Sequence, residues 1–312
     1  MRHCQEMETN MKRQKLSALG AAAGVAVAIA MGVPAYAASP DCPNNGVVRF
    51  GVEPYDTAPR LIPVYNEIAK MIGEKIGCDV QVFVTTSYNA EIEAMRNGKL
   101  EFAEFGPLGY VLAHQVAKAE AVATFANAQG KPDTYWASLV TYPGSGIKTV
   151  QDIKGHSFAF SDPASTSGHL FPAYGLRKAG IDPDKDIRAI YAGSHTSSFE
   201  ALYNKKVDAG ELNSEQMESA MQRGHYKDGD FVFLWKSNPI PIDPLTVRGD
   251  LPAAFKAKLI AVMQNIDLSK LPEADRKIMG VHGTRTVATD DKAFDGIRDL
   301  VKTLNIDLEK LS

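Results

Sequence analysis

Residues 162–180 read DPASTSGHLFPAYGLRKAG, in which three consecutive hydroxyl side chains stand directly before a glycine: Ser165, Thr166, Ser167 and Gly168. The residues that follow have the spacing of an amphipathic helix. One hydroxyl at a helix start is an ordinary cap. A helix start also presents unpaired N–H groups and the positive end of its dipole, and a glycine lets a ligand approach the backbone. On these residues alone, capping and the binding of a tetrahedral oxyanion are equally supported.

Other chemistries have less support in the chain. It contains neither G-x-x-x-x-G-K-[ST] nor G-x-G-x-x-G, which argues against a nucleotide site. A hydrolase would pair one of these serines with His195 and an acid, but no G-x-S-x-G occurs, and such a triad can be picked out of almost any chain of this length. No clustered Cys/His/Asp set indicates a metal centre. We therefore expect no metal and no cofactor.

The elements that must position these residues alternate between strands and helices, which is typical of α/β proteins. Apolar and β-branched runs predict strands at 47–52, 79–85, 102–105, 121–126, 135–142, 157–160, 188–192 and 231–236. Helical spacing predicts helices at 61–76, 92–96, from 107 onward, and at 168–179, 199–203 and 215–223. Pro239, Pro241 and Pro244 then mark a return segment, in which the chain leads back to the first part of the fold. A mostly helical tail is predicted at 253–264, 273–279 and 291–304.

This order predicts two α/β lobes, each a mixed sheet flanked by helices. We expect one lobe to contain residues 38–133 plus 241–312 and the other to contain residues 134–240. The chain would cross between them near 127–134 and 237–243, and the C-terminal helices would return to cover the first lobe. Such an arrangement leaves a cleft between the lobes, where ligands commonly bind.

The N-terminus has the three parts of a secretory signal. From Met11 the chain has a basic start, an apolar run over residues 16–33 and an A-x-A ending at Ala37. A membrane anchor is the alternative, because the apolar run approaches spanning length. Removal of residues 1–37 takes away four basic and two acidic residues and moves the formal charge from -3 to -5. We expect a soluble periplasmic protein starting near Ala38, with no long-range attraction for nucleic acid.

Export leaves two cysteines, Cys42 and Cys78, in an oxidising compartment. Each lies directly before a predicted strand. If those strands are parallel neighbours, their starting ends are close enough for a disulfide. The alternative is two free thiols.

Several blocks of the sequence occur in an order that resembles the periplasmic phosphonate- and phosphite-binding proteins that feed ABC importers. They are TSYNAEIEAMRNGKLEFAEFGPLGY, DPASTSGHLFP, AGSHTSSFEAL, LNSEQME and NPIPIDPLTV, and the D-P-x-S-T-S-G segment is the most specific of them. The resemblance covers most of the mature chain and implies the two-lobe, type II periplasmic-binding-protein fold with its ligand in the interlobe cleft. It also implies that the site residues are Ser165, Thr166, Ser167, Gly168, Tyr88, Tyr135, His195, Glu215 and Asp243.

One position departs from the family's pattern, since Phe105 stands where some members have tyrosine. The two carboxylates Glu215 and Asp243 also need explaining, because they would repel a dianion. They would either hold a ligand amine, as in 2-aminoethylphosphonate, or share a proton with phosphite or a short alkylphosphonate. The sequence does not distinguish between a ligand amine and a shared proton.

The resemblance implies a receptor and not an enzyme. We expect a monomer that closes around a small phosphorus oxyanion and then docks onto an ABC permease in the inner membrane. The alternatives are a periplasmic hydrolase of phosphate esters or phosphonates, and a binding protein for a sulfonate or sulfate.

Overall fold

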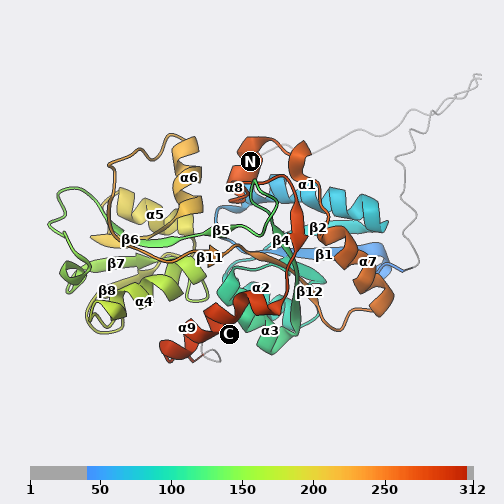
Figure 1. Ribbon diagram of the computed structural model, residues 1–312, viewed down its shortest axis with the longest axis horizontal. Helices are drawn as coiled ribbons and strands as arrows, with labels where there is room; N and C mark the ends of the chain where they lie inside the picture. The colour runs from blue at the N-terminus through green and yellow to red at the C-terminus, as the bar shows by residue number, and fades with distance from the viewer. Residues whose placement is uncertain (1–40, 308–312) are drawn as a thin grey trace, which may run out of the picture. The chain divides into compact units, whose positions relative to one another are not determined.

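The structure, a computed structural model, describes residues 41–307 and contains two main β-sheets (Figure 1). The larger sheet has the strand order β13-β4-β12-β3-β1-β2, and the smaller has the order β10-β6-β9-β7-β8. Strand β1 pairs in parallel with β2 and β3, and β7 pairs in parallel with β8 and β9. The other pairs in these sheets are antiparallel. Both sheets are mixed, so the predicted α/β class is confirmed.

The larger sheet is built from the first and last parts of the described chain. Its strands are β1 (Val47–Val52), β2 (Asp79–Val84), β3 (Phe102–Glu104), β4 (Ala119–Phe125), β12 (Pro244–Arg248) and β13 (Thr286–Ala288). The helices that pack with it are α1 (Ala58–Ile76), α2 (Tyr88–Arg96), α3 (Pro107–Ala117), α7 (Ala253–Met263), α8 (Glu273–Ile278) and α9 (Asp295–Thr303). One continuous apolar core joins these elements, so the C-terminal helices do cover this sheet.

The first helix shows how the sequence pattern produces this packing. Leu61, Tyr65, Ile68 and Ile72 recur at helical spacing, and all four are buried in α1. The helix ends at Gly77, which has the left-handed backbone conformation, with φ at 73°. Glycine adopts this conformation without the steric cost that a side chain would bring.

The smaller sheet is formed by β6 (Ala137–Thr141), β7 (Ser157–Phe160), β8 (Arg188–Tyr191), β9 (Ala209–Asn213) and β10 (Val232–Lys236). Helices α4 (Phe171–Lys178), α5 (His195–Tyr203) and α6 (Ser214–Gln222) flank it. Adjacent residues of β6 point to opposite faces, and each joins a different apolar cluster, Leu139 with Phe158 and Val140 with Phe199. Short 3-10 turns complete the described chain at Asn44–Gly46, Val150–Ile153, Leu268–Lys270 and Asp291–Phe294.

Two further strands lie where the chain passes between the sheets. β5 (Thr134–Tyr135) and β11 (Ile240–Pro241) pair antiparallel, with Tyr135 opposite Ile240, and lie between the two sheets in Figure 1. The two passages therefore run side by side as a ribbon. The boundaries of the lobes at 133/134 and 240/241 stay a prediction.

Four strands differ from the sequence-based expectations. β9 was not predicted, β11 and β12 fall in the segment that was predicted as a return segment, and β13 falls in the mostly helical tail. β9 contains a glycine, a glutamate and an asparagine, none of which favours strands. It forms because it lies between β6 and β7 and pairs with both. Pairing with distant segments outweighed local propensity in this case.

Candidate ligand-binding site

A cavity lies between the two sheets and is lined by residues from both. The larger sheet and its helices contribute Glu53, Tyr55, Asp56, Tyr88, Glu104, Gly106, Ile278, Met279 and Gly280. The smaller sheet and its helices contribute Ser165, Thr166, Ser167, His195, Asn213, Glu215, Gln216 and Ser219, and the connecting segments contribute Tyr135 and Asp243.

Helix N-termini face this cavity from both sides. Tyr88 and His195 are the first residues of α2 and α5, Glu215 is the second residue of α6, and Gly106 caps α3. All four line the cavity. The positive ends of four helix dipoles are therefore directed at one small space, which favours a negative charge there in addition to any effect of basic side chains.

The three hydroxyls occupy a turn of π-helix, Thr166–Leu170, that precedes α4. The oxygen of Ser165 accepts a hydrogen bond from Gly168 N–H at 3.1 Å, and that of Thr166 accepts one from Leu108 N–H at 2.8 Å. The oxygen of Ser167 accepts one from Asn213 Nδ2 at 3.1 Å. A hydroxyl that already accepts a hydrogen bond keeps its own hydrogen to donate. This loop can therefore direct three donors at a group in the cavity.

His195 links the hydroxyl loop to a buried glutamate. Its Nδ1 lies 3.0 Å from Glu211 Oε1, and its Nε2 lies 3.3 Å from Ser165 Oγ and 3.4 Å from Ser167 Oγ. Burial lowers the pKa of His195, but the surrounding carboxylates, first Glu211 and then Asp243 and Asp162, together outweigh burial and the net pKa is raised. The carboxylate only accepts hydrogen bonds, so Nδ1 carries a hydrogen, and the raised pKa favours a second hydrogen on Nε2. His195 is thus suited to present a cationic donor to the cavity.

Two tyrosines add donors and apolar walls. Tyr88 and Tyr135 are both buried and both line the cavity. Burial raises the pKa of each phenol well above its ordinary value, with nearby carboxylates adding to the effect. Both phenols are therefore neutral near pH 7, and each can donate one hydrogen bond.

The cavity also contains an unusual number of carboxylates: Glu53, Glu104, Glu215 and Asp243 line it. Burial, reinforced by the other carboxylates, raises the pKa of Glu53 and Glu215 well above the ordinary value. Burial raises the pKa of Asp243 to about 7, against the opposing effect of His195. Carboxyl groups in such a cluster bind protons or cations near neutral pH because their negative charges repel one another.

Eight of the nine site residues predicted from the sequence line this one cavity. Gly168 is not among the residues that line it, and a Cβ there would lie 1.7 Å from Ser161 Oγ and 2.9 Å from His195 Cε1. Its missing side chain makes room for those two residues. The close approach of a ligand to Gly168 stays a prediction. Phe105 is fully buried in the core of the larger sheet and does not line the cavity.

Other residues of the site were missed from the sequence. Glu211 and Asn213, which contact His195 and Ser167, lie on the unpredicted strand β9. Glu53 follows one predicted strand and Glu104 lies within another, and an exposed position is the ordinary expectation for each. No local sequence signal marks any of these four residues as buried beside a ligand cavity.

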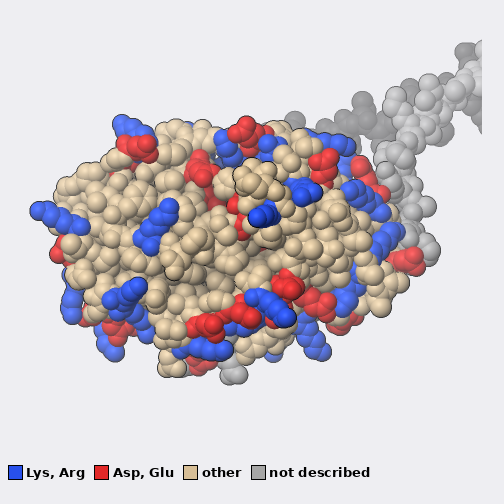
Figure 2. Space-filling model, in the orientation of Figure 1, with Lys and Arg blue, Asp and Glu red and all other residues tan. Residues whose placement is uncertain are grey.

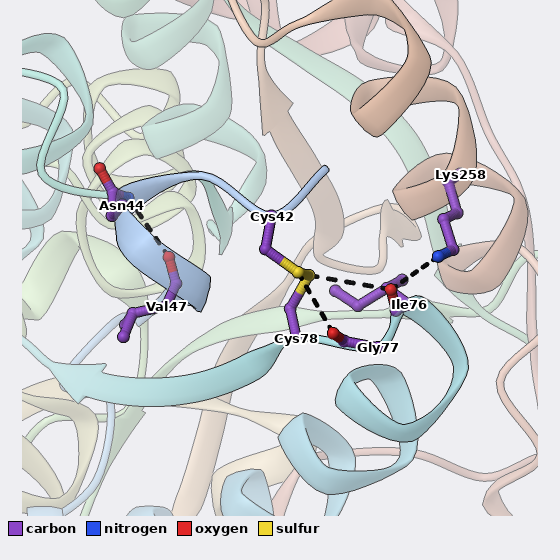
Figure 3. Close-up of a disulfide and its surroundings, with 7 residues drawn as sticks. All are labelled: Cys42, Asn44, Val47, Ile76, Gly77, Cys78 and Lys258. Atoms are coloured by element: carbon purple, nitrogen blue, oxygen red, sulfur yellow. Dashed lines mark hydrogen bonds between the residues drawn. A yellow bond between two sulfur atoms is a disulfide. The ribbon is translucent and has the colours of Figure 1, made fainter. Parts of the chain in front are cut away.

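A disulfide lies at the end of the larger sheet where strands β1 and β2 begin (Figure 3). The sulfur atoms of Cys42 and Cys78 are 2.04 Å apart. The two strands are parallel neighbours, as the pairing hypothesis requires. Beside the disulfide, Lys258 Nζ of α7 donates a hydrogen bond to the Ile76 carbonyl at 2.7 Å.

The rest of the described surface adds few functional indications. On the face in Figure 2, Lys and Arg are interspersed with Asp and Glu, and neither sign gathers into a broad patch. Between residues 41 and 307, no helix has the length and apolar character needed to span a bilayer. The same residues contain no group of three or more His, Cys, Asp or Glu arranged to hold a metal ion. The predicted signal over residues 1–37 lies outside the described residues.

Two mixed sheets joined by a paired ribbon, with a polar cavity between them, define a two-lobe binding protein. The chain belongs to the family described as ABC transporter, phosphonate, periplasmic substrate-binding protein, whose model matches residues 50–294. Members of this family are the periplasmic substrate-binding components of transporters. The predicted family and two-lobe fold are confirmed.

Individual relatives agree with this assignment. The phosphonates-binding periplasmic protein of Escherichia coli is 29% identical over 231 residues, which are 72% of this chain and 67% of the relative. The phosphate-import protein PhnD of Mycolicibacterium smegmatis is 30% identical over 203 residues, which are 62% of this chain and 63% of the relative. The crystal structure of the binding protein of an ABC phosphonate transporter from Pseudomonas aeruginosa has a TM-score of 0.73 and 28% identity, and covers 83% of this chain and 86% of that one.

Proposed function

We propose that this chain captures a small phosphorus oxoacid in the periplasm and delivers it to the permease of an ABC importer. The ligand class is a phosphonate or phosphite, including 2-aminoethylphosphonate. The observation that carries the proposal is the hydroxyl loop, in which Ser165, Thr166 and Ser167 each accept an N–H and keep a hydrogen to donate. Helix capping accounts for only one of these hydroxyls, that of Ser165.

The contacts that we assign to the ligand follow from the cavity wall. The hydroxyls of Ser165, Thr166 and Ser167 and the imidazolium of His195 donate to the phosphorus-bound oxygens. Tyr88 from one lobe and Tyr135 from the connecting ribbon donate hydrogen bonds to the ligand, and their rings enclose it. Glu215 and Asp243 hold whatever cation or proton the ligand carries. None of these groups acts as a catalyst in this proposal.

Ligand contacts from both lobes would favour a closed arrangement, since the ligand binds that arrangement best. Small-angle X-ray scattering with and without methylphosphonate should show a smaller radius of gyration in the ligand-bound protein. We further propose that the protein acts as a monomer, that the lobes divide at 133/134 and 240/241, and that residues 1–37 are removed on export.

The test compares the hydroxyl loop with an ordinary helix cap. Ser194 caps α5, and its oxygen accepts a hydrogen bond from Ser197 N–H at 3.1 Å, but it does not line the cavity. The triple substitution of Ser165, Thr166 and Ser167 by alanine should abolish the calorimetric binding of phosphonates. Ser194→Ala should lower the melting temperature and leave binding unchanged. Unaltered affinity in the triple variant would reduce the loop to a cap and remove the proposal.

A ligand panel tests the chemical class. Phosphite, hypophosphite, methylphosphonate, 2-aminoethylphosphonate, phosphate and sulfate are compared by the rise in melting temperature, because a ligand that binds only the folded protein stabilises it by mass action. We expect the phosphorus oxoacids to give the largest shifts. Preference for sulfate, or for methylsulfonate over methylphosphonate in competition, would favour a sulfonate- or sulfate-binding protein. Release of phosphate from any ligand would favour a hydrolase.

A further inference from the structure

The two lobes also contact one another outside the ligand cavity, along helix α6. This helix flanks the smaller sheet and packs against α8, which belongs to the larger one (Figure 1). His282, which follows α8, lies with its Nε2 3.0 Å from the carboxylate of Glu218 on α6. Neither His282 nor Glu218 lines the cavity. The pair is therefore a direct link between the lobes that is separate from the ligand-binding residues.

The other ring nitrogen of His282 is held at the connecting ribbon. Its Nδ1 lies 2.7 Å from Asp133 Oδ2. Asp133 comes directly before β5, and its second carboxylate oxygen accepts a hydrogen bond from Thr134 N–H at 2.8 Å. The backbone carbonyl of Asp133 accepts a further hydrogen bond from Ile242 N–H at 3.1 Å, in the other connecting segment. The carboxylate that orients His282 is thus fixed where the two passages between the lobes meet.

The groups around His282 require its ring to be a cation. A carboxylate only accepts hydrogen bonds, so contacts of both ring nitrogens with carboxylates need a hydrogen on each. Hydrogen bonds to Asp133 and Glu218 raise the pKa of His282 to about 10. Glu215 of α6 also interacts electrostatically with His282. The cationic side chains on neighbouring segments have other partners: Lys277 contacts Glu273, Arg276 contacts the Leu271 carbonyl, and Arg285 contacts the Gly130 carbonyl.

Separation of the lobes would affect the two contacts of His282 differently. His282 and Asp133 belong to the larger lobe and its connection, whereas Glu218 moves with α6. Opening therefore keeps the bond to Asp133 and breaks the one to Glu218. Because the imidazolium has one more partner in the closed arrangement, it shifts the equilibrium between open and closed lobes toward the closed one. A ligand that binds the closed arrangement best then gains affinity, since a larger fraction of the protein is ready to bind it.

We propose that His282 is a positioning residue that stabilises the closed arrangement by holding α6 against the connecting ribbon, and that Asp133, His282 and Glu218 together form an interlobe latch. The latch acts on closure and does not touch the ligand. It therefore changes the affinity for every ligand by the same factor and leaves the preference among ligands unchanged. The inference rests on the proposed function for its ligand measurements, but closure itself can be measured without a ligand.

The experiment measures the dissociation constants of methylphosphonate and phosphite by calorimetry between pH 6 and pH 9.5. The side chains of His282 and Glu218 are 37% and 35% exposed, so solvent screens their contact. At pH 6, His282→Gln and Glu218→Gln should each weaken the binding of both ligands about three- to fivefold. The double variant should be no weaker than either single one, because the two residues make one contact.

The dependence on pH separates the latch from a purely structural role of His282. The ratio of the dissociation constants of His282→Gln and the wild-type protein should be greatest at pH 6. It should shrink as the pH rises toward 10, because the wild-type ring then loses its second hydrogen. Titration of His195 cancels in this ratio, since both proteins contain that residue.

His225→Gln is the matched control, because His225 lies 4.0 Å from Glu200 and both belong to the smaller lobe. It should leave both affinities unchanged. Unchanged affinity in His282→Gln, additive losses in the double variant, a ratio that does not vary with pH, or an equal loss in His225→Gln would overturn the latch and leave the proposed function intact.

Scattering from the ligand-free protein keeps the two proposals distinguishable. If neither ligand binds the wild-type protein, the proposed function fails, and the latch is judged by small-angle X-ray scattering at pH 6 alone. A larger radius of gyration in ligand-free His282→Gln than in the ligand-free wild-type protein would support the latch, and equal radii would overturn it.

Discussion

The hydroxyl oxygen of Thr166, in the smaller lobe, accepts a hydrogen bond from the backbone N–H of Leu108, the second residue of α3 in the larger lobe, at 2.8 Å. Leu108 N–H is one of the helix-start donors that have no partner within the helix. The same hydroxyl lines the cavity and keeps a hydrogen that it can donate there. Under the proposed function, Thr166 would couple ligand binding to the contact between the lobes.

Replacement of the Thr166 hydroxyl should weaken ligand binding, because it removes a hydrogen bond that joins the two lobes in the closed arrangement. Thr166→Val keeps the size of the side chain but leaves Leu108 N–H buried without an acceptor and removes one ligand donor. We expect a loss of about 2 kcal/mol in binding free energy by calorimetry, within the range for an unsatisfied buried donor. Thr166→Ser restores the hydroxyl and should recover most of the affinity. Equal losses in both variants would mean that the methyl group matters and the hydrogen bond does not.

The pair of His195 and Glu211 should make ligand binding depend on pH. His195→Ala should weaken binding by about 1–3 kcal/mol, the scale of a charge-assisted bond. In the wild-type protein, affinity should fall as the pH rises through the raised pKa of His195, because the imidazolium loses its hydrogen on Nε2. Glu211→Gln removes the carboxylate that raises this pKa, so the fall should begin at lower pH. An unchanged pH profile in Glu211→Gln would separate Glu211 from the function of His195.

His282 joins three parts of the molecule outside the cavity. Its Nδ1 lies 2.7 Å from Asp133 at the connecting ribbon, and its Nε2 lies 3.0 Å from Glu218 on α6. Hydrogen bonds to Asp133 and Glu218 raise the pKa of His282 to about 10. Both bonds require the protonated ring, so their stabilisation is complete below pH about 6.5 and is lost as the pH rises toward 10.

The test is the melting temperature of His282→Gln between pH 6 and pH 9.5. The difference from the wild-type protein should be greatest at pH 6 and shrink as the pH rises. His225→Gln is the control, because His225 is more exposed and lies 4.0 Å from Glu200. A difference that stayed constant with pH would show that His282 contributes by packing alone.

Glu91 should destabilise the ligand-free protein at neutral pH. It is fully buried, and burial, with Glu104 and Asp243 adding to it, raises its pKa well above the ordinary value. A buried acid with a raised pKa favours the folded state at low pH, so that contribution is lost as the pH rises above about 4.5. Glu91→Gln should therefore raise the melting temperature at pH 8 more than at pH 5. A lower melting temperature at pH 8 would count against this account.

The disulfide between Cys42 and Cys78 should contribute measurably to stability. It closes a loop over a sequence separation of 36 residues. By lowering the entropy of the unfolded chain, a cross-link of this length contributes about 3–4 kcal/mol to the free energy of unfolding. A reductant should lower the melting temperature of the wild-type protein and leave that of the Cys42→Ser/Cys78→Ser variant unchanged. Titration of the unfolded, unreduced protein should find no free thiol from this pair. Two free thiols would refute the bond.

The sequence by itself determined the local features of this protein. The hydroxyls at 165–167 stand next to one another in the chain, and helices such as α1 follow from apolar spacing that needs no distant partner. The alternation of strands and helices was sufficient for the α/β class, and the ordered motifs were sufficient for the family. Strands β1 and β2, which follow Cys42 and Cys78, were also predicted from local apolar runs.

Only the tertiary structure decided which distant residues meet. β9 carries weak strand formers and exists because β6 and β7 pair with it. It brings Glu211 to His195 and Asn213 to the hydroxyl loop. Glu104 gives no local sign of its environment in the sequence, and its raised pKa depends on burial and then on Asp243, 139 positions away. Burial and charge clustering are sums over neighbours that the fold supplies, and no local pattern encodes them.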